Sequence, residues 1–511
     1  MNIKSLLLLT ILFKNCVSLK ILALYPNVMI SHYLVFEPLF HELANRGHNV
    51  TIVSSFQKEQ NYPNIRFIDV NDGNKKPHEM LPMNFFNGGR ISKYFELYQL
   101  ARTGLEICNA YKNSKNIKSF LEENNKYDLI IVELFNTYCH FGVLKQNKAV
   151  NIGLSSTDML PWMNQWFGNP ENPSYIPTLF LDYNDEMTFL QRVENTLMWA
   201  YSKFIHEYWI AQVGNEFSKK HLGVDLYEGG DALYNISLLL LNRHFTYHTP
   251  RPLSPNVIEV GGIHIKKPKP LPGNLAKIVE GSPNGVIFMS MGSTLKGSSF
   301  PEAQRKMFIK VFSVLKQTVI WKWEDEMKDL PKNVLTQKWI PQLDMLCHPN
   351  VKLFITQGGL LSTQEAVHCG VPMLMLPQFA DQHYNAAALK KTGAIALKLR
   401  TTNEEELLNS IKKLLTAESA NNAKELAQLF NDRPMSPMDT AIYWIEYVAK
   451  YKGAPFMRTK VTDLSYYQYL LLDVIGFLLL IVAAGAYLLL TILKLVKKLL
   501  FKKSVAKLKK Q

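Results

Sequence analysis

The residues best suited to chemistry lie in two glycine-containing turns, each directly after a short apolar run. The first turn, Met291 to Thr294, contains Gly292 and Ser293, and the second, Gln357 to Gly359, contains two glycines. Glycines between a strand and a helix let backbone amides approach a phosphate, and the helix N-terminus then stabilises its charge. One such turn is weak evidence, but two in the same half of the chain predict a phosphate site.

Polar side chains around the second turn supply the other parts of a nucleotide site. Glu365 lies within two turns of the phosphate-facing end of the predicted helix, where its carboxylate could accept hydrogen bonds from ribose hydroxyls. Trp339 offers a flat face for a base, and Gln342 offers an amide. Further polar candidates are Ser362, on the same helix, and Asp381 and Gln382, after the next predicted strand.

His32 is the candidate proton acceptor. It follows the first predicted strand, at the carboxyl edge of the sheet, and imidazole titrates in the range that general base catalysis needs. The chain has 13 histidines, and a single histidine is more often structural than catalytic, so position alone does not assign this role.

Two parallel sheets are needed to position these residues. From Lys20 onward short β-branched runs alternate with amphipathic stretches, which predicts βαβ units. The expected strands are 21–25, 50–54, 127–133, 286–289, 318–323, 353–356 and 373–376. The predicted fold is α/β, with two doubly wound domains facing each other across a cleft between the carboxyl ends of their sheets. We also expect a kink at Pro38 and a capping box of Thr402 and Glu405.

Proline density sets the expected domain boundaries. Prolines gather between Thr249 and Pro272, which predicts a linker. We therefore place an N-terminal domain at 19–250, the linker at 251–280 and a C-terminal domain at 281–455, followed by a juxtamembrane segment at 456–473.

Both ends of the chain indicate a membrane protein. Residues 1–18 are typical of a secretory signal peptide, with Lys4, an apolar run and small residues at the expected cleavage site. Residues 474–493 contain no charge and are long enough to cross a bilayer. The Lys-rich tail at 494–511 should face the cytosol, so we expect a single-pass type I protein whose body lies in the lumen.

The tail also bears on location and on partners. Lys507 and Lys509 stand fifth and third from the end, an arrangement that resembles the dilysine retrieval signal of endoplasmic-reticulum membrane proteins. A basic anchor on anionic lipid is the alternative. The net charge is +14, but ten of these charges lie in the tail and the signal peptide, so nucleic acid is not an expected partner.

Cysteine spacing predicts neither a disulfide framework nor a zinc site. The chain has five cysteines, one of them inside the signal peptide, with no CxxC pair. One isolated bridge remains possible in an oxidising compartment. The sequon at Asn235 could carry a glycan, whereas the one at Asn49 lies in a predicted strand.

The second turn and its surroundings resemble the signature of the UDP-glycosyltransferases. That signature reads Phe354-Ile355-Thr356-Gln357-Gly358-Gly359, then Ser362, Glu365, Pro372, Pro377, Asp381 and Gln382, with Trp339-Ile340-Pro341-Gln342 upstream. It is long and fixed in spacing, hence specific, and the resemblance extends to the signal peptide, Ser31-His32, Gly261-Gly262 and the anchor. The sequence of residues 360–365 is most similar to that of arthropod members of the family. The resemblance implies the GT-B fold.

The resemblance also implies a role for each matching residue. Trp339 would stack on uracil, Gln342 would bind the uridine and Glu365 would hold the ribose diol. The diphosphate would be held by Gly292, Ser293, Gln357, Gly359 and Ser362, and the sugar by Asp381 and Gln382. Many relatives have His at position 357, so the neutral amide of Gln357 should weaken donor binding.

In this family the histidine that matches His32 is the base, and a strand-end carboxylate orients it. By spacing from Asp128 that partner is Glu133, where many relatives have Asp; a structural strand-end acid is the alternative reading. The implied reaction is a single displacement with inversion at the sugar. No metal or other cofactor is expected, because the chain has no Asp-x-Asp clamp and helix N-termini can stabilise the leaving diphosphate.

The expected protein is thus an enzyme that transfers a hexose from a UDP-sugar to a small lipophilic acceptor at the luminal face of the endoplasmic reticulum. We expect glucose, since arthropod members mostly use it, whereas vertebrate members use glucuronate. Trp162, Trp166, Phe167 and Tyr175 are candidates either for aglycone contact or for packing at the membrane.

Two other classes of protein remain open. One is a catalytically weak member that binds UDP-sugars or lipophiles without turnover, which the departures at Gln357 and Glu133 suggest. The other is a membrane receptor with a basic tail, in which the glycine turns and Trp339 would only be part of the hydrophobic core. The sequence does not determine the oligomeric state, and a homo-oligomer is one of the possible states.

Overall fold

The computed structural model describes residues 18–25, 27–56, 62–73, 81–82, 90–228, 230 and 232–508. The predicted signal peptide and the last residues of the tail therefore fall outside the described residues. The chain divides into one compact unit, Met1–Arg458, and a second, Thr459–Gln511, which are described separately here.

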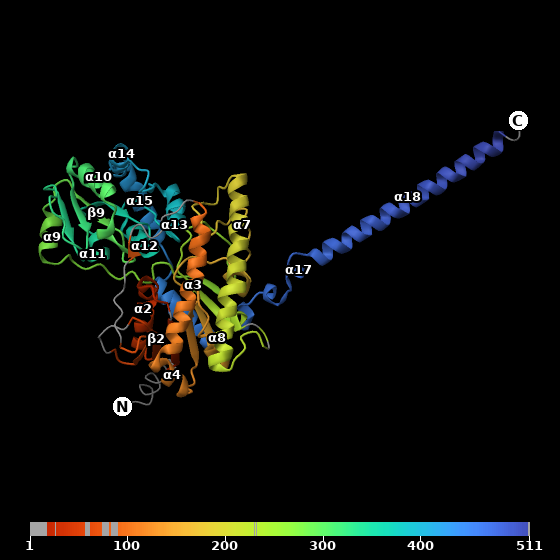
Figure 1. The fold of residues 1–511 in the computed structure, drawn as a ribbon, viewed down its shortest axis with the longest axis horizontal. Helices are drawn as coiled ribbons and strands as arrows, with labels where there is room; N and C mark the ends of the chain where they lie inside the picture. Colours follow the sequence, from red (N-terminus) through yellow and green to blue (C-terminus); the bar gives the residue numbers. More distant parts are fainter. Residues whose placement is uncertain are drawn as a thin grey trace, which may run out of the picture. The chain divides into compact units, whose positions relative to one another are not determined.

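The first half of the large unit is built on a seven-stranded parallel sheet (Figure 1). Its strand order is β3 (Ile65–Asp69), β2 (Asn49–Ser54), β1 (Lys20–Tyr25), β5 (Leu129–Glu133), β6 (Val150–Ser155), β7 (Ile236–Leu241) and β8 (Val257–Glu259). Its five central strands are buried nearly throughout, as expected where helices cover both faces of a parallel sheet, whereas the edge strands β3 and β8 are partly exposed.

Helices connect these strands and cover the sheet. They are α2 (Ile30–Asn45), α3 (Ser92–Asn113), α4 (Lys115–Glu122), α5 (Phe141–Gln146), α6 (Met163–Phe167), α7 (Phe189–Ile205) and α8 (Gln212–Leu222), with a π-helical turn at His206–Ala211 between the last two. The long helices α3 and α7 lie side by side (Figure 1). Pro38 lies inside α2, and Gly47 follows its end with φ +92°.

The second half has a six-stranded parallel sheet. Its order is β12 (Val334–Gln337), β11 (Thr318–Lys322), β9 (Val286–Ser290), β13 (Val351–Thr356), β14 (Met373–Met375) and β15 (Ile395–Ala396). The surrounding helices are α9 (Gly273–Glu280), α10 (Glu302–Ser313), α11 (Gln342–Leu346), α12 (Leu360–Cys369), α13 (Gln382–Leu389), α14 (Glu404–Leu414) and α15 (Ala417–Asn431), and the chain continues into α16 (Pro437–Lys450). The predicted α/β fold with two doubly wound sheets is confirmed, and every predicted strand is present within two residues of its expected bounds.

Two segments pack in a different half from the one their sequence position suggests. Residues 257–259, inside the expected linker, form β8 and pair with β7 as the edge of the first sheet. Helix α16, inside the expected C-terminal domain, buries Ala441, Ile442 and Ile445 in the core formed by β1 and α2. The helix carries enough apolar surface to cross back and cover the first sheet, so the two halves are interleaved in sequence.

Local details correct three further expectations. Asn403, not Thr402, caps α14, because its side chain accepts from the backbone N–H of Glu406 at 2.9 Å. His32 lies in the first turn of α2 rather than in a loop. Two disulfides, Cys108–Cys139 and Cys347–Cys369, pair all four cysteines of the large unit's described part, one bridge more than expected.

The second unit contains α17 (Tyr466–Tyr469) and the long helix α18 (Leu472–Leu508). Within α18, residues Leu472–Phe501 are long and apolar enough to cross a membrane, and none of this span is buried. The predicted span 474–493 lies inside this range.

Candidate active site

His32, Glu133 and Ser156 meet at the carboxyl edge of the first sheet. Glu133 ends β5, and Ser156 follows the end of β6, which is the neighbouring strand. His32 lies in the first turn of α2, after β1 on the other side of β5. Parallel strands end at the same edge, so residues that are far apart in sequence converge there.

The contacts of the imidazole assign its proton. His32 Nδ1 lies 2.6 Å from Glu133 Oε1 and 2.6 Å from Ser156 Oγ. The Ser156 hydroxyl donates to Glu133 Oε1 at 2.8 Å, so its oxygen faces Nδ1 as an acceptor. Two close acceptors outweigh the amide nitrogen of Asn27 at 3.2 Å and place the proton on Nδ1. Nε2 keeps its lone pair and accepts no hydrogen bond from any residue in the described part of the chain.

The surroundings fix this group in place. The Tyr25 hydroxyl donates to the backbone carbonyl of His32 at 2.6 Å, and the ring of Phe135 packs against the imidazole at 4.4 Å. The Glu133 side chain is 1% exposed and that of His32 is 10% exposed. Burial and the nearby Glu133 raise the pKa of Tyr25 well above its ordinary value. The imidazole is therefore held at one nitrogen and accessible at the other.

The two glycine turns converge in the second half. Gly292 has φ +74°, and a Cβ added there would lie 2.4 Å from Nε2 of Gln357. A Cβ at Gly359 would lie 3.4 Å from the same atom. The Gln357 side chain thus lies against the first turn at a distance that only glycine at position 292 allows, whereas a Cβ at position 359 would be in ordinary contact with it. The Gln357 carbonyl oxygen is buried without a hydrogen-bond partner among the described residues. The turn at Gly359 leads into α12, whereas the turn at Gly292 leads into the short strand β10 (Leu295–Lys296) rather than a helix.

A cation lies beside these turns. Lys322, the last residue of β11, donates from Nζ to the carbonyl of Gly292 at 2.6 Å. Burial lowers its pKa, and Glu324 opposes that shift.

Gln342 links the residues expected to bind the nucleoside. Its Nε2 donates to Glu365 Oε2 at 2.7 Å and to Ser362 Oγ at 2.8 Å. Burial raises the pKa of Glu365 to about 7, against the hydrogen bond from Gln342, which lowers it. Trp339 is 71% exposed, so its ring face is open to a partner. The group offers a flat aromatic surface beside a carboxylate whose protonation changes near neutral pH.

Asp381 and Gln382 stand at the start of α13. Asp381 Oδ2 accepts from Asn385 at 3.1 Å. Burial raises the pKa of Asp381, while this hydrogen bond and the charge of His32 lower it, so the carboxyl lies near the imidazole of the other half. The Gln382 carbonyl oxygen accepts from the backbone N–H of Gln378 at 2.9 Å, which leaves its amide group as the part that could bind a ligand.

Further contacts hold the two halves together within the large unit. The Tyr384 hydroxyl donates to Asp158 at 2.9 Å, and Gln364 donates to Asn242 at 2.9 Å. Strand β4 (Leu81–Pro82) of the first half pairs with β10, directly after the Gly292 turn. The predicted residues thus lie in two groups, which we call the base group (His32, Glu133) and the donor group (the residues predicted to bind the UDP-sugar), and Asp381 interacts electrostatically with His32.

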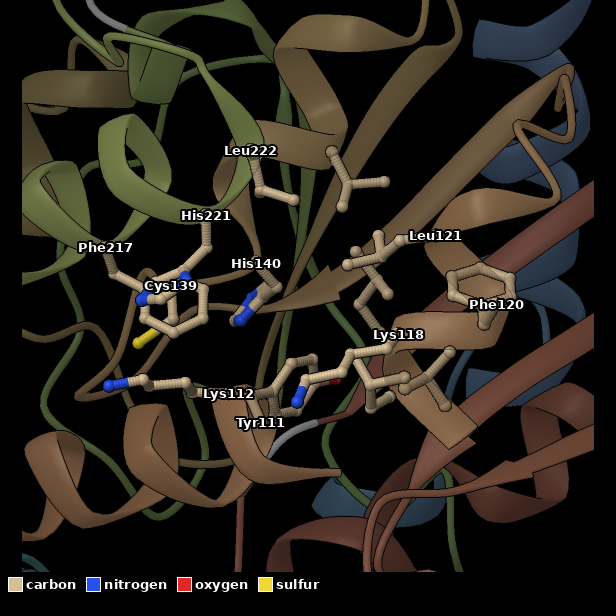
Figure 2. A pocket seen from close by; sticks show the side chains of 14 residues that line it. Tyr111, Lys112, Lys118, Phe120, Leu121, Cys139, His140, Phe217, His221 and Leu222 are labelled. Carbon is tan, nitrogen blue, oxygen red and sulfur yellow. The ribbon is translucent and has the colours of Figure 1, made fainter. Parts of the chain in front are cut away.

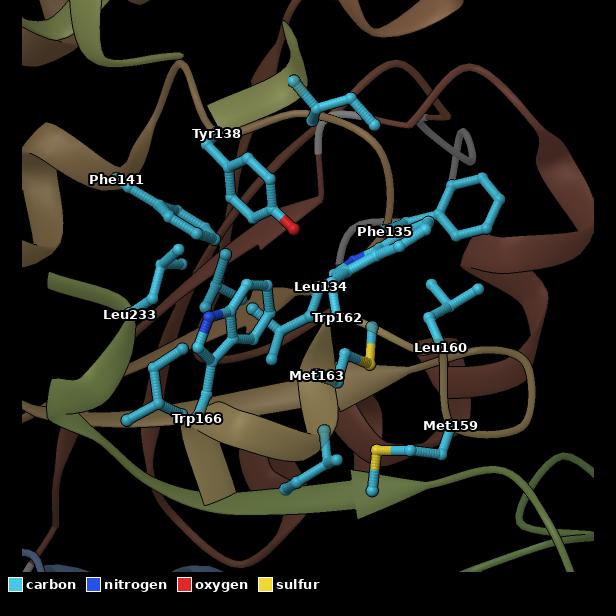
Figure 3. Close-up of a cluster of buried hydrophobic side chains, with 14 of the residues drawn as sticks. Leu134, Phe135, Tyr138, Phe141, Met159, Leu160, Trp162, Met163, Trp166 and Leu233 are labelled. Atoms are coloured by element: carbon cyan, nitrogen blue, oxygen red, sulfur yellow. The ribbon is translucent and has the colours of Figure 1, made fainter. Parts of the chain in front are cut away.

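Three of the four aromatic acceptor candidates are core residues. Trp162, Trp166 and Phe167 are at most 1% exposed and belong to one core cluster with Tyr138 and Phe141. Figure 3 shows Trp162 and Trp166 beside these two rings. Tyr175 is 40% exposed. The segment around Trp162 has no periodic pattern in sequence, and it nevertheless buries Trp162, Trp166 and Phe167.

Sequence reasoning missed Ser156, Lys322 and Asn385. All three lie at or just beyond the carboxyl ends of strands, or on the helix that follows one. His32 and Glu133 were found because they lie at the ends of strands. The same criterion, applied to β6 and β11, points to Ser156 and Lys322.

Two doubly wound domains with functional residues at facing strand ends define the GT-B class of glycosyltransferase. Solved structures agree on the fold: spinosyn forosaminyltransferase SpnP (TM-score 0.55, 18% identity) and glycosyltransferase VinC in complex with dTDP (TM-score 0.55, 16% identity) each cover 84% of this chain over their full length.

Sequence comparison identifies the family. Residues 20–510 match the family model described as UDP-glucoronosyl and UDP-glucosyl transferase. The chain is 38% identical to UDP-glucosyltransferase 2 of Dactylopius coccus over 92% of each protein, and 32% identical to UDP-glucuronosyltransferase 2B13 of Oryctolagus cuniculus over 90% of each. The chain belongs to this family, and it is a UDP-glycosyltransferase.

Proposed function

We propose that the protein transfers glucose from UDP-glucose to a hydroxyl of a small lipophilic acceptor, with His32 as the general base. The observation that carries this proposal is the imidazole itself: Nδ1 is held by Glu133 and Ser156, and Nε2 forms no hydrogen bond with any described residue.

In the proposed reaction, Nε2 takes the acceptor's hydroxyl proton while the acceptor oxygen forms a bond to the anomeric carbon of the sugar. The bond from that carbon to the diphosphate oxygen breaks, and UDP leaves with the electron pair. An α-linked donor thus gives a β-glycoside. The buried carboxylate of Glu133 stabilises the imidazolium that forms, which is how a charged neighbour assists a base.

The donor half supplies the remaining roles. Trp339 stacks on the uracil, Gln342 binds the uridine and Glu365 accepts from the ribose hydroxyls. Asp381 and Gln382 bind the sugar hydroxyls. The diphosphate is held by the two turns through Gly292, Ser293, Gln357, Gly359 and Ser362. We add Lys322, whose ammonium group lies against the first turn, as a compensating charge for the neutral Gln357.

The proposal needs no metal ion or other cofactor, because turn amides and a lysine neutralise the leaving diphosphate. Activity should be unchanged by EDTA. Glucose is proposed because a Dactylopius coccus relative is named as a UDP-glucosyltransferase.

The test uses the full-length protein in lipid discs, a panel of phenols, and either UDP-glucose or UDP-glucuronate. His32→Ala should lower kcat by roughly 10²–10⁴-fold, with UDP binding unchanged. His41→Ala is the matched control, because His41 lies further along the same helix and stacks on Tyr62. A protein that UDP stabilises against heat, yet that releases no UDP with any acceptor, would instead be a binder without turnover.

We further propose that the large unit lies in the lumen of the endoplasmic reticulum, anchored by α18. Asn235 is exposed and forms a sequon with Ser237. In sealed microsomes, Asn235→Gln should abolish an endoglycosidase-sensitive mass shift, while added protease should remove a C-terminal tag. Protection of the tag would overturn this topology.

A further inference from the structure

A cavity lies inside the first half, on the sheet face that α2 does not cover. Its volume is about 210 Å³. Leu24 of β1 and Val53 of β2 form one wall, and helices α3, α4, α5 and α8 form the others. A cavity of about 150 Å³ holds a benzene molecule, so this one has room for one or two fused rings.

Two buried polar side chains in the cavity wall have no partner. The hydroxyl of Tyr111 and both ring nitrogens of His140 form no hydrogen bond with any described residue, although Tyr111 is 5% exposed and His140 is 2% exposed. Figure 2 shows the His140 ring among the side chains of Tyr111, Lys118 and His221. Buried polar groups are nearly always hydrogen-bonded, so these two side chains in the cavity wall have unused donor and acceptor capacity.

The rim of the cavity is positively charged. Lys112 ends α3 and Lys118 lies on α4; both are exposed, and neither forms an ion pair within the described residues. His221 completes the rim, and burial together with the charges of Lys112, Lys220 and Lys118 lowers its pKa. The two lysines, Lys112 and Lys118, carry like charges, and an anion between them would relieve their repulsion.

The cavity is separate from the transfer site. Leu24 and Val53 belong to the apolar core on one sheet face, whereas Tyr25 and the residues after His32 pack on the opposite face. No residue lining the cavity belongs to the donor group.

We propose that this cavity is a second binding site, which takes a compact hydrophobic anion. The ring system fills the apolar interior beside Tyr111 and His140, and the anionic group lies between Lys112 and Lys118. The site goes beyond the proposed function, because it neither contacts the base nor requires a UDP-sugar.

The test measures binding of naphthalene-2-sulfonate by calorimetry, with full-length protein in phosphatidylcholine discs at low salt. A sulfonate cannot serve as a glycosyl acceptor, so occupancy of the cavity is measured without turnover. Wild type should bind one equivalent, and saturating UDP should leave the affinity unchanged. Lys112→Gln combined with Lys118→Gln should weaken binding at least tenfold. Tyr111→Phe removes a hydroxyl that has no partner, so it should leave folding intact and weaken binding about threefold.

The control replaces two other exposed lysines nearby, Lys115→Gln with Lys126→Gln, and so changes the net charge equally. Absence of binding to wild type at 2 mM, displacement by UDP, or an equal loss in the control pair would each overturn the proposal. An affinity of the Lys112 and Lys118 double variant within twofold of wild type would do the same. Catalytic activity is not part of the readout, so failure here is distinguishable from failure of the proposed function.

Discussion

The length of one side chain decides how the proposed base is oriented. Glu133 reaches Nδ1 of His32 at 2.6 Å from the last position of β5, where many relatives have the shorter Asp. The extra methylene is accommodated because Ser156 also contacts both partners, at 2.6 Å from Nδ1 and 2.8 Å from the carboxylate. Glu133 thus departs from the family pattern, and its contacts with His32 and Ser156 accommodate the longer side chain.

We expect Glu133→Gln to lower kcat by roughly 10²-fold or more, because a neutral amide no longer stabilises the imidazolium. Glu133→Asp keeps the charge and loses only reach, so it should retain about a tenth of the activity. Steady-state kinetics at saturating UDP-glucose measure both. Wild-type kcat in Glu133→Gln would show that this residue is merely a structural strand-end acid.

A second residue-scale prediction concerns pH. Burial raises the pKa of Glu365 to about 7, so the carboxyl of the free protein is largely protonated at pH 6 and charged at pH 8. In the proposed donor site the charged carboxylate accepts hydrogen bonds from the ribose hydroxyls more strongly than the protonated carboxyl does. Binding of UDP-glucose, measured by calorimetry, should therefore weaken as the pH falls through 7, and Glu365→Gln should remove this dependence.

The same shift has the opposite effect on folding. A carboxyl whose folded pKa is raised binds more protons in the folded state than in the unfolded state, so stability falls as pH rises from about 4.5 to 7. Glu365→Gln should then raise the unfolding free energy of the unliganded protein at pH 8 by roughly 1–3 kcal/mol, and have little effect at pH 5. Equal effects at both pH values in denaturant titrations would contradict the assignment.

At the scale of elements, the turn after β9 must come close to the turn after β13. Gly292→Ala would place its Cβ 2.4 Å from Gln357 Nε2, so this side chain must move away from the position in which we propose that it binds the diphosphate. We expect donor affinity to fall about tenfold, which UDP titration measures, together with a stability loss of roughly 1 kcal/mol from the positive φ.

Gly47→Ala is the matched control for this turn. Gly47 has φ +92° and would meet nothing within 4 Å, so it has a comparable backbone penalty without the contact. It should lower stability and leave UDP affinity intact. Equal affinity losses in the two variants would mean that Gln357 is not the residue displaced.

At the scale of the whole molecule, a buried polar network joins the two halves of the large unit. Arg243 and Asp158 form an ion pair at 2.9 Å in which both side chains are at most 4% exposed, and Tyr384 of the second half donates to the same carboxylate. A buried charge pair contributes little net stability but is costly to disrupt, so its value here is to fix how the halves meet.

Tyr384→Phe removes the bond that crosses between the halves. It should cost about 1–3 kcal/mol in unfolding free energy and raise KM for the donor, since the base and the donor group are no longer held together as firmly. Tyr175→Phe, at an exposed ring with no hydrogen bond in the described structure, should change neither. An unchanged KM in Tyr384→Phe would show that this bond stabilises the fold without positioning the site.

The sequence by itself determined the features that are written locally. Strand positions follow from β-branched runs, and the candidate membrane span follows from an uncharged stretch of sufficient length. The fixed spacing around Gly358 and Gly359 indicated the family, which the family model confirms. Only the tertiary structure decided that α16 and β8 complete the first sheet's half, that Trp162 is core, and that Ser156 and Lys322 join the site. Local sequence patterns indicate helices, strands and turns. The features that only the tertiary structure decided depend instead on which strand ends become neighbours in the fold. That choice is made by burying apolar surface from distant parts of the chain, and no short window of sequence contains it.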